Sequence, residues 1–329
     1  MKLYRFGAAV AFTCAVASAS LLAQGRGGGP PPVVTPMATA DQLKQDPQLK
    51  DRSLDRFGFP AHKIIGNLYY VGTLECSSFL FVTPAGNILI NSNYEETLPL
   101  LKTAIESLGF KMEDTKILLA SHAHPDHQTA DATFKEMTGA TTEFMAEDVP
   151  ALKNMKPPSG KEHPIDHVLH DGDTVSLGGT TLTAHLTPGH TLGCTTWTTK
   201  ITDAGKSYDV VIVCGGLQDT DRLVYNNGYP AIADDFKNTF TAWAAMPCDI
   251  FLGAHSWFFN LTGKYAKLKA NPKVNPYIDP AGYKQFIADS RALWTKLVDE
   301  QTAAGPPAPR GGGGRGGTGG GQAPTPPNN

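Results

Sequence analysis

The segment HAHPDH at residues 122–127 carries an unusual density of side chains that bind metals. The metal-binding types in it are His122, His124, Asp126 and His127. They follow the apolar run ILLA at 117–120, so a buried strand would deliver them to a loop and then a helix. Imidazole and carboxylate are common zinc ligands, and one tetrahedral zinc would not readily use all four. The spacing predicts a two-metal site, and the plain alternative is a solvated polar turn.

Two further histidines follow expected strands in the second half of the chain. His190 lies in LTPGHT at 186–191, and His255 lies in FLGAH at 251–255. Ligand-bearing loops gather at one edge of a layered sheet, so both histidines can converge with the HAHPDH segment.

Strand and helix patterns alternate along the chain and must position these side chains. Expected strands cover residues 63–71, 78–83, 87–90, 116–121, 142–146, 174–177, 181–186, 195–201, 208–214 and 249–253. Expected helices cover residues 95–108, 126–137, 147–155, 232–245 and 281–301. This order predicts an α/β fold with two sheets sandwiched between helices.

Composition limits the class of protein. The chain has 329 residues, of which 41% are hydrophobic and 18% charged, with a net charge of -3. A sizeable core is therefore expected, and the absence of a basic excess argues against nucleic acid as a partner. Length favours one folded domain over residues 40–302. A monomer is the default expectation, and the expected partner is a small-molecule substrate rather than nucleic acid.

The N-terminal residues have the composition of a targeting segment. Lys2 and Arg5 precede a small, apolar run that ends in ASA at 17–19. This pattern predicts a secretory signal peptide over 1–19, because the apolar run is too short for a membrane span; a buried N-terminal helix is the alternative. The protein is then expected to be exported, periplasmic or secreted.

Glycine and proline dominate the segments on either side of the expected domain. They predict a flexible leader over 20–39 and a disordered tail over 303–329, since little apolar surface remains to bury there. No stable membrane span is expected after processing.

Four cysteines follow the expected signal peptide: Cys76, Cys194, Cys214 and Cys248. They allow three pairings in an exported protein. Cys194 and Cys214 are symmetric about Ala204 and would face each other across a hairpin. The preferred interpretation is nevertheless two buried thiols, because directly opposed strand residues often suit disulfide geometry poorly.

The combined motifs resemble the metallo-β-lactamase superfamily over most of residues 60–300. HxHxDH at 122–127, TPGHT at 187–191 and His255 carry that resemblance. Further segments are similar to subclass B3 metallo-β-lactamases: HDGD at 170–173, HLTPGHTLGCTTW at 185–197, YP at 229–230, MPCD at 246–249 and NPYIDP at 275–280. The resemblance implies a four-layered αβ/βα sandwich, the metallo-β-lactamase fold, with two zinc ions per chain.

The resemblance also implies how the ligands divide. One zinc would be held by His122, His124 and His190, and the other by Asp126, His127 and His255. It implies a hydrolase that opens the β-lactam ring by attack of a zinc-bound hydroxide, an activity of the antibiotic-resistance type. Asp126 would orient the hydroxide, and the second zinc would receive the leaving amide nitrogen.

The sequence departs from the family at positions near the expected substrate. Asn91 stands where relatives usually carry aspartate, and the serines that subclass B3 enzymes often place near Gly216 and Gln218 are missing. Gln218, Thr220 and Asn227 are the candidates to replace these serines, and Trp257 is a candidate for lining the substrate cleft.

Two other functions stay open. One is a lactonase or thioesterase on the same site, although such relatives often carry a bridging aspartate where this chain has CGGL at 214–217. The other is a non-catalytic exported zinc-binding protein. The remaining histidines have plainer interpretations: His163, His167 and His170 in a solvated segment, His185 in the core or behind the ligands, and His62 at the surface.

Overall fold

The structure, a computed structural model, describes residues 57–307. The predicted signal peptide, the leader and almost all of the predicted tail lie outside these residues. Within them, none of the helices has the length and apolar character needed to cross a membrane.

The described strands belong to two sheets. The strands are β1 (His62–Ile65), β2 (Leu68–Tyr70), β3 (Phe79–Thr83), β4 (Gly86–Ile90), β5 (Thr115–Leu119), β6 (Thr141–Met145), β7 (His167–Leu169), β8 (Thr174–Leu177), β9 (Thr180–Leu186), β10 (Thr195–Asp203), β11 (Lys206–Val213) and β12 (Ile250–Gly253). The first sheet has the order β1-β2-β3-β4-β5-β6-β7, and the second has the order β12-β11-β10-β9-β8. Strands β4 to β7 run parallel, as do β11 and β12.

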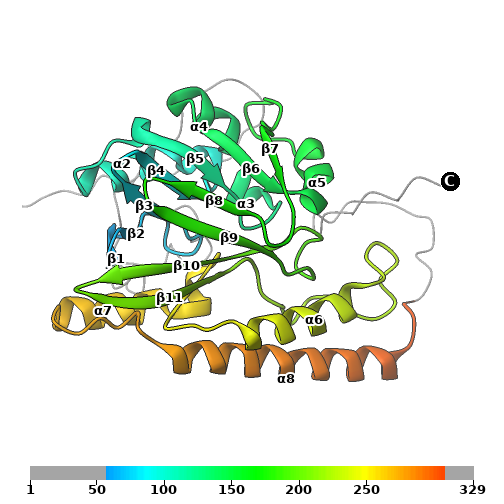
Figure 1. Ribbon diagram of the computed structural model, residues 1–329. Coiled ribbons are helices and arrows are strands. Elements are labelled where there is room, and N and C mark those ends of the chain that lie inside the picture. The colour runs from blue at the N-terminus through cyan, green and yellow to red at the C-terminus, as the bar shows by residue number, and fades with distance from the viewer. Residues whose placement is uncertain (1–56, 308–329) are drawn as a thin grey trace, which may run out of the picture. The chain divides into compact units, whose positions relative to one another are not determined.

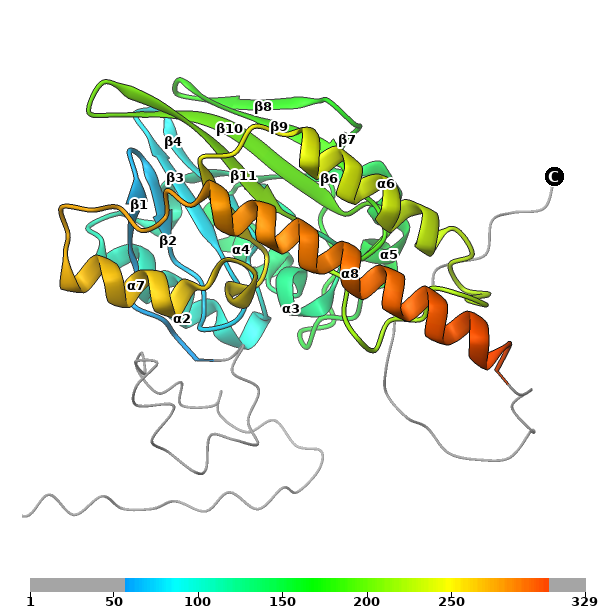
Figure 2. The same cartoon turned by 90° about the horizontal axis from the view of Figure 1, so that it is seen from below.

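Helices cover the outer faces of both sheets. They are α2 (Leu98–Ser107), α3 (Pro125–Gln128), α4 (Asp131–Thr138), α5 (Val149–Asn154), α6 (Ile232–Ala245), α7 (Leu261–Ala270) and α8 (Pro280–Ala304), with 3-10 turns η3 (Glu95–Thr97), η4 (Met112–Asp114), η5 (Ala146–Asp148) and η6 (Ser256–Phe259). In Figures 1 and 2, α2 and α4 lie along the first sheet, whereas α6 and α8 lie along the second. The predicted αβ/βα sandwich is confirmed.

Side chains along the strands of the first sheet alternate between its two faces, which explains how the sheet packs against both the second sheet and the outer helices. In β3, Phe79 and Phe81 belong to the core that includes the second sheet, whereas Leu80 packs with Leu101 and Phe134 of the outer helices. Successive strand residues point to opposite faces, so a strand of apolar residues can serve both layers.

The strand expected over 63–71 is instead the hairpin of β1 and β2. Gly66 and Asn67 form its turn, and Gly66 has a φ of 50°. A Cβ at Gly66 would lie 2.5 Å from Ile201 Cγ2, so both the turn and its packing need glycine. A Gly-Asn pair between apolar runs is a turn signal that the β-rich composition obscured.

The helix expected over 126–137 is divided into α3 and α4. The Ala130 N–H donates to Asn93 O and the Asn93 N–H donates to His127 O, at 3.1 and 2.9 Å. These bonds to a distant loop replace helical ones at the break. Two short elements, β7 and α7, lie where no element was predicted.

Candidate metal centre

The HAHPDH segment forms a tight turn where β5 meets α3. His122 and His124 lie in the turn, and the His124 N–H donates to His122 O at 3.0 Å. Pro125 occupies the first position of α3, where its missing N–H costs no helical bond. Asp126 and His127 then project from the first turn of the helix, beside the two loop histidines.

Three imidazoles that the sequence predicts as ligands of one zinc ion lie together in a first group: His122, His124 and His190. One ring nitrogen of each lies within 4.8 Å of the others. His190 Nε2 lies 3.2 Å from His122 Nε2. His190 comes from the loop between β9 and β10, so the second sheet completes a group that the first sheet begins.

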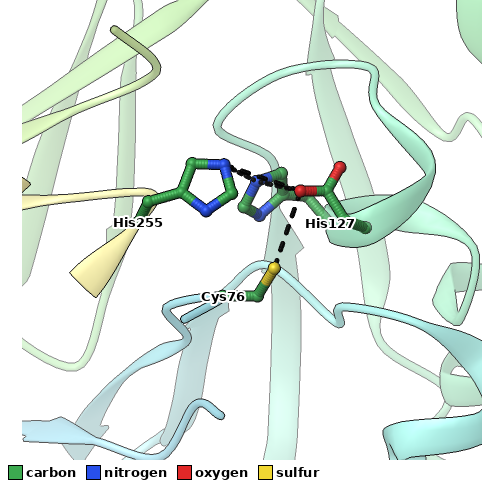
Figure 3. A group of neighbouring side chains, drawn as sticks. Cys76, His127 and His255 are labelled. Atoms are coloured by element: carbon green, nitrogen blue, oxygen red, sulfur yellow. Dashed lines mark hydrogen bonds and ion pairs between the residues drawn. The ribbon is translucent and has the colours of Figure 1, made fainter. Parts of the chain in front are cut away.

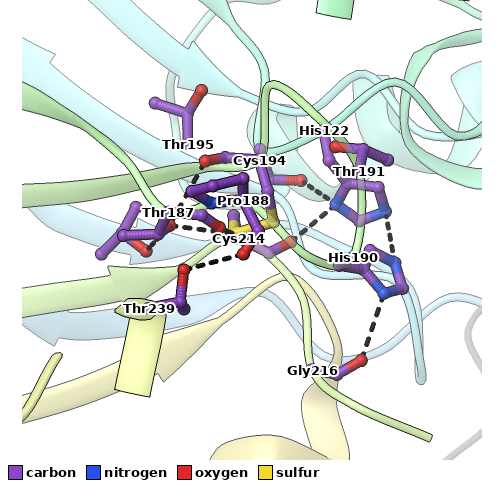
Figure 4. The surroundings of a disulfide bond; sticks show 12 residues. His122, Thr187, Pro188, His190, Thr191, Cys194, Thr195, Cys214, Gly216 and Thr239 are labelled. Atoms are coloured by element: carbon purple, nitrogen blue, oxygen red, sulfur yellow. Dashed lines mark hydrogen bonds between the residues drawn. A yellow bond between two sulfur atoms is a disulfide. The ribbon is translucent and has the colours of Figure 1, made fainter. Parts of the chain in front are cut away.

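Backbone carbonyls fix the orientation of two of these rings (Figure 4). His122 Nδ1 lies 2.6 Å from Cys214 O, and His190 Nδ1 lies 3.1 Å from Gly216 O. A carbonyl only accepts, so each Nδ1 carries the proton and each Nε2 keeps a lone pair. Two lone pairs facing each other at 3.2 Å repel, and a cation between them removes that repulsion. The group therefore fits a metal ion.

Burial keeps these imidazoles neutral. It is the largest cause that lowers the pKa of His122 and His190 well below the ordinary value, and neighbouring histidines lower both further. Burial also lowers the pKa of His124. Neutral imidazole is the form that binds metal, so protons compete weakly for the site at neutral pH.

The other three predicted ligands lie in a second group, of which Figure 3 shows His127 and His255. Asp126 Oδ2 is 3.2 Å from His127 Nε2 and 3.5 Å from His255 Nε2. The rings of His122 and His127 have centroids 4.4 Å apart, which makes the two groups neighbours. Burial would raise the pKa of Asp126, but the imidazoles of His127 and His255 hold it well below the usual range.

Cys76 belongs to the second group and was not predicted there. Its sulfur, with donor atoms of Asp126, His127 and His255, makes a set whose members all lie within 4.8 Å of one another. Cys76 precedes β3 and has no motif around it, so only the fold brings it to the site. Its backbone forms an antiparallel bridge with His255.

Asn91 lies beside the second ligand group, with its Nδ2 3.4 Å from His127 Nδ1. It is fully buried and has a φ of 66°, a conformation that asparagine tolerates better than most residues. Its Oδ1 accepts from the Ser121 N–H at 2.8 Å, and its Nδ2 donates to Ser77 O at 3.2 Å. The amide uses both a donor and an acceptor, which an aspartate at this position would not provide.

Asp148 joins the two loops that carry the first ligand group. Its carboxylate accepts from the Ala123 N–H at 2.8 Å, from the Thr191 hydroxyl at 2.9 Å and from the Gly193 N–H at 2.7 Å. Burial raises the pKa of Asp148, while these donors oppose that rise. Sequence reasoning missed this residue because its partners are distant in the chain.

A disulfide joins Cys194 to Cys214 behind His122 (Figure 4). The preference for two buried thiols was therefore wrong. The turn between β10 and β11 is Ala204-Gly205, and the ladder pairs Trp197 with Ile212. In this register Cys194 and Cys214 are not directly opposite each other, contrary to the expectation. Their Cα atoms lie 5.4 Å apart, within the usual range for a disulfide.

The residues proposed from the sequence to contact substrate lie in exposed segments. Gln218, Thr220 and Asn227 are exposed in the stretch between β11 and α6. Trp257 is 52% exposed and its ring stacks on His255, with centroids 4.1 Å apart. Trp257 thus lies at the metal centre, and substrate contact by any of the four stays a prediction.

Two histidines differ from their predicted surroundings. His62 is buried, with Nε2 2.6 Å from the Tyr277 hydroxyl, because β1 packs beneath the segment that leads to α8. The side chain of His163 is 2% exposed and lies 2.8 Å from the buried Asp131 carboxylate. His167 and His170 are exposed, as expected. His185 is half-buried and bonds the Thr198 hydroxyl at 2.7 Å.

Comparison with known proteins agrees with this geometry. Residues 71–204 match the family model described as the metallo-beta-lactamase superfamily. A hydroxyacylglutathione hydrolase of Fuscovulum blasticum is 32% identical over 98 residues, which cover 30% of this chain and 33% of that protein. The chain thus spans about a third of the length of this curated relative.

Solved structures match over much more of the chain. The native FEZ-1 metallo-beta-lactamase from Legionella gormanii is 45% identical with a TM-score of 0.70, covering 74% of this chain and 97% of that one. BJP-1, a subclass B3 metallo-beta-lactamase of Bradyrhizobium japonicum, is 34% identical with a TM-score of 0.69, covering 75% and 96%. The chain therefore belongs to the metallo-β-lactamase superfamily, and its relatives include subclass B3 enzymes.

Proposed function

We propose that this protein is a zinc-dependent hydrolase that opens the β-lactam ring. The two adjacent ligand groups carry the proposal, because one offers three neutral imidazoles and the other a carboxylate with two imidazoles. Such donor sets suit zinc. The 45% identity to FEZ-1 over 97% of that chain supports β-lactams as the substrate class.

The predicted division of ligands is retained in the proposal. His122, His124 and His190 would hold one zinc ion, and Asp126, His127 and His255 would hold the second. Bound zinc supplies Lewis-acid chemistry: it lowers the pKa of a water molecule, polarises a carbonyl and stabilises a leaving nitrogen.

The residues of the chain have separate tasks in this proposal. The carbonyls of Cys214 and Gly216 hold the rings of His122 and His190. Asp126, whose low pKa keeps it ionised, accepts a hydrogen bond from the attacking water at a carboxylate oxygen and orients it. The indole of Trp257 offers an apolar wall to the substrate beside His255.

A turnover panel tests this function directly. We expect the zinc-loaded protein to open a penicillin, a cephalosporin or a carbapenem, and a chelator to abolish the reaction until zinc is restored. His122→Ala and His255→Ala should each lower kcat/KM by at least about 100-fold. Replacing a residue that only hydrogen-bonds to a metal ligand already lowers metal affinity or activity by about 10–100-fold, and these variants remove a ligand itself. His167→Ala, at an exposed site, is the matched control.

The same panel decides between the alternatives. Rapid cleavage of a lactone or thioester with no loss of any β-lactam would overturn the proposal in favour of a related hydrolase. The stretch from Cys214 to Gly216 argues against that outcome, because it contributes carbonyl oxygens and no carboxylate to the site. Full activity in both alanine variants would exclude the site itself.

We further propose that the protein is exported to the periplasm or secreted, with cleavage of residues 1–19. A disulfide between Cys194 and Cys214 is compatible with an oxidising compartment. Mass spectrometry of the protein recovered outside the cytoplasm should show a chain that begins at Ser20. An uncleaved chain retained in the cytoplasm would contradict this proposal.

A further inference from the structure

Cys76 contacts the second ligand group, and the function proposed above does not use it. The residue is buried, with 0% exposure, and its Sγ lies 3.6 Å from Asp126 Oδ2. Figure 3 shows the sulfur directed toward the same space as the rings of His127 and His255. A sulfur, a carboxylate oxygen and two imidazole nitrogens form a mixed donor set that tetrahedral zinc accepts.

Three of these four donors are spaced like the corners of a tetrahedron around one small cation, and the sulfur lies close to them. Zinc–ligand bonds of ~2.0–2.3 Å imply donor–donor separations of roughly 3.3–3.7 Å. His127 Nε2 and His255 Nε2 are 3.3 Å apart, and they lie 3.2 and 3.5 Å from Asp126 Oδ2. Cys76 Sγ lies 3.6 Å from that oxygen and within 4.8 Å of both imidazole nitrogens, so the sulfur lies on the side of the remaining corner.

The turn before β3 fixes the backbone of Cys76. Its N–H donates to Thr73 Oγ1 at 3.0 Å, and its carbonyl accepts from Asn93 Nδ2 at 3.1 Å. A Cβ at Gly72 would lie 2.5 Å from the Cys76 carbonyl oxygen, so the close turn requires glycine. With the bridge to His255, these bonds hold the backbone that carries the thiol beside the second group.

We propose that Cys76 is a fourth protein ligand of the second metal ion, bound as a thiolate together with Asp126, His127 and His255. The inference rests on the two-metal function proposed above. As the sulfur–metal bond forms, the thiol proton passes to solvent and no atom changes oxidation state. Four protein ligands would complete a tetrahedral shell at this position, so the open position for water would belong to the three-histidine group, and a leaving nitrogen would bind the second ion as a fifth ligand.

Cobalt(II) titration of the full, metal-stripped chain tests the proposal without measuring activity. We expect a near-ultraviolet thiolate-to-cobalt charge-transfer band to appear as the second group fills. Cys76→Ser should remove this band and weaken binding of that ion by at least about tenfold, the lower end of what outer partners contribute. Cys248→Ser, at a half-buried cysteine in the segment before β12, is the matched control and should keep the band.

The outcomes separate this inference from the function. Two bound cobalt ions with no thiolate band in the wild-type chain would overturn the role of Cys76 and leave the β-lactamase proposal intact. This outcome is measured on the wild-type chain alone, so it does not depend on whether a variant folds. A band that persists in Cys76→Ser would also overturn it. A thiolate band in a protein that opens no β-lactam would support Cys76 and overturn the function. No cobalt binding at all would overturn both.

Discussion

At the scale of single residues, the candidate metal centre depends on groups that hold the predicted ligands in place as much as on those ligands themselves. Asp148 is the clearest of these positioning residues, because one carboxylate accepts from the loop of His122 and from the loop of His190. Its side chain is buried, so no water replaces a lost bond readily.

Replacing Asp148 with asparagine should therefore weaken the site and the fold together. The amide places a donor against one of the N–H groups, which leaves a buried donor unpaired at a cost of about 1–3 kcal/mol. We expect a lower free energy of unfolding in urea and roughly 10-fold weaker zinc binding, measured by competition with a chromophoric chelator. Glu147→Gln removes a neighbouring exposed carboxylate and should change neither; equal effects in both variants would show that charge alone matters.

Replacing Trp257 should change the affinity for substrate and leave metal binding unchanged. Its exposed ring stacks on His255, so truncation to alanine removes an apolar wall without removing a ligand. An aromatic contact worth about 0.5–1.5 kcal/mol predicts a KM for β-lactams raised about 2- to 10-fold, with zinc content unchanged. Steady-state kinetics of Trp257→Ala and Trp257→Phe check this, and an unchanged KM in the alanine variant would remove Trp257 from the substrate site.

At the scale of elements, the disulfide ties the loop before β10 to the end of β11. Cys194 lies four residues after His190, and Cys214 supplies the carbonyl that orients His122. The cross-link therefore restrains two segments that meet at the first ligand group.

Removing the disulfide should lower the free energy of unfolding, although neither cysteine is a predicted metal ligand. Cys194 and Cys214 are 20 residues apart, and a loop of that size is worth about 3 kcal/mol in the chain-entropy description. Urea unfolding of the double variant Cys194→Ala/Cys214→Ala should show this loss. Cys248→Ser, which leaves the bond intact, should match the wild type, and equal midpoints for all three proteins would show that the cross-link contributes nothing.

Strong local patterns predicted many elements well. The α6 helix runs over Ile232–Ala245 and β8 over Thr174–Leu177, as their patterns indicated. Six ligand candidates were also predicted, because their types and spacing are encoded locally or carried by family motifs, and the structure brings these side chains together in two groups.

What the sequence could not supply depends on contacts between distant segments. The break between α3 and α4 follows from bonds to Asn93, and the place of Cys76 follows from its bridge to His255. His62 shows the same limit, since its burial depends on Tyr277 far along the chain. Periodicity and motifs contain no information about such pairs.

At the scale of the whole described chain, His62 links stability to pH. It joins β1 to the segment that precedes α8, and its Nδ1 faces Pro60 O while its Nε2 faces the Tyr277 hydroxyl. Burial lowers the pKa of His62 from 6.5 to about 4, opposed by the bond to Pro60. The folded protein therefore favours the neutral ring more strongly than the unfolded chain does.

The stability contributed by neutral His62 is complete above pH 6.5 and is lost as the pH falls towards about 4. The difference between these pKa values corresponds to about 3 kcal/mol at most. Thermal unfolding of metal-free wild type and His62→Gln should therefore converge on acidification, since the histidines of the metal centre titrate alike in both. His167→Gln should track the wild type at every pH, whereas a constant gap between wild type and His62→Gln would refute the shift.

The bridge between Cys76 and His255 also sets the order in which the centre can be assembled. Cys76, Asp126 and His127 are synthesised early in the chain. His255 is synthesised later, because it follows β12, the last described strand in chain order. Closing so long a stretch of chain is entropically costly and slows folding. Until β12 docks, a growing chain carries a thiol and a carboxylate without their last imidazole. Binding of the proposed ion at this group would then require complete folding, and the ion would stabilise fully folded molecules in preference to partly folded ones.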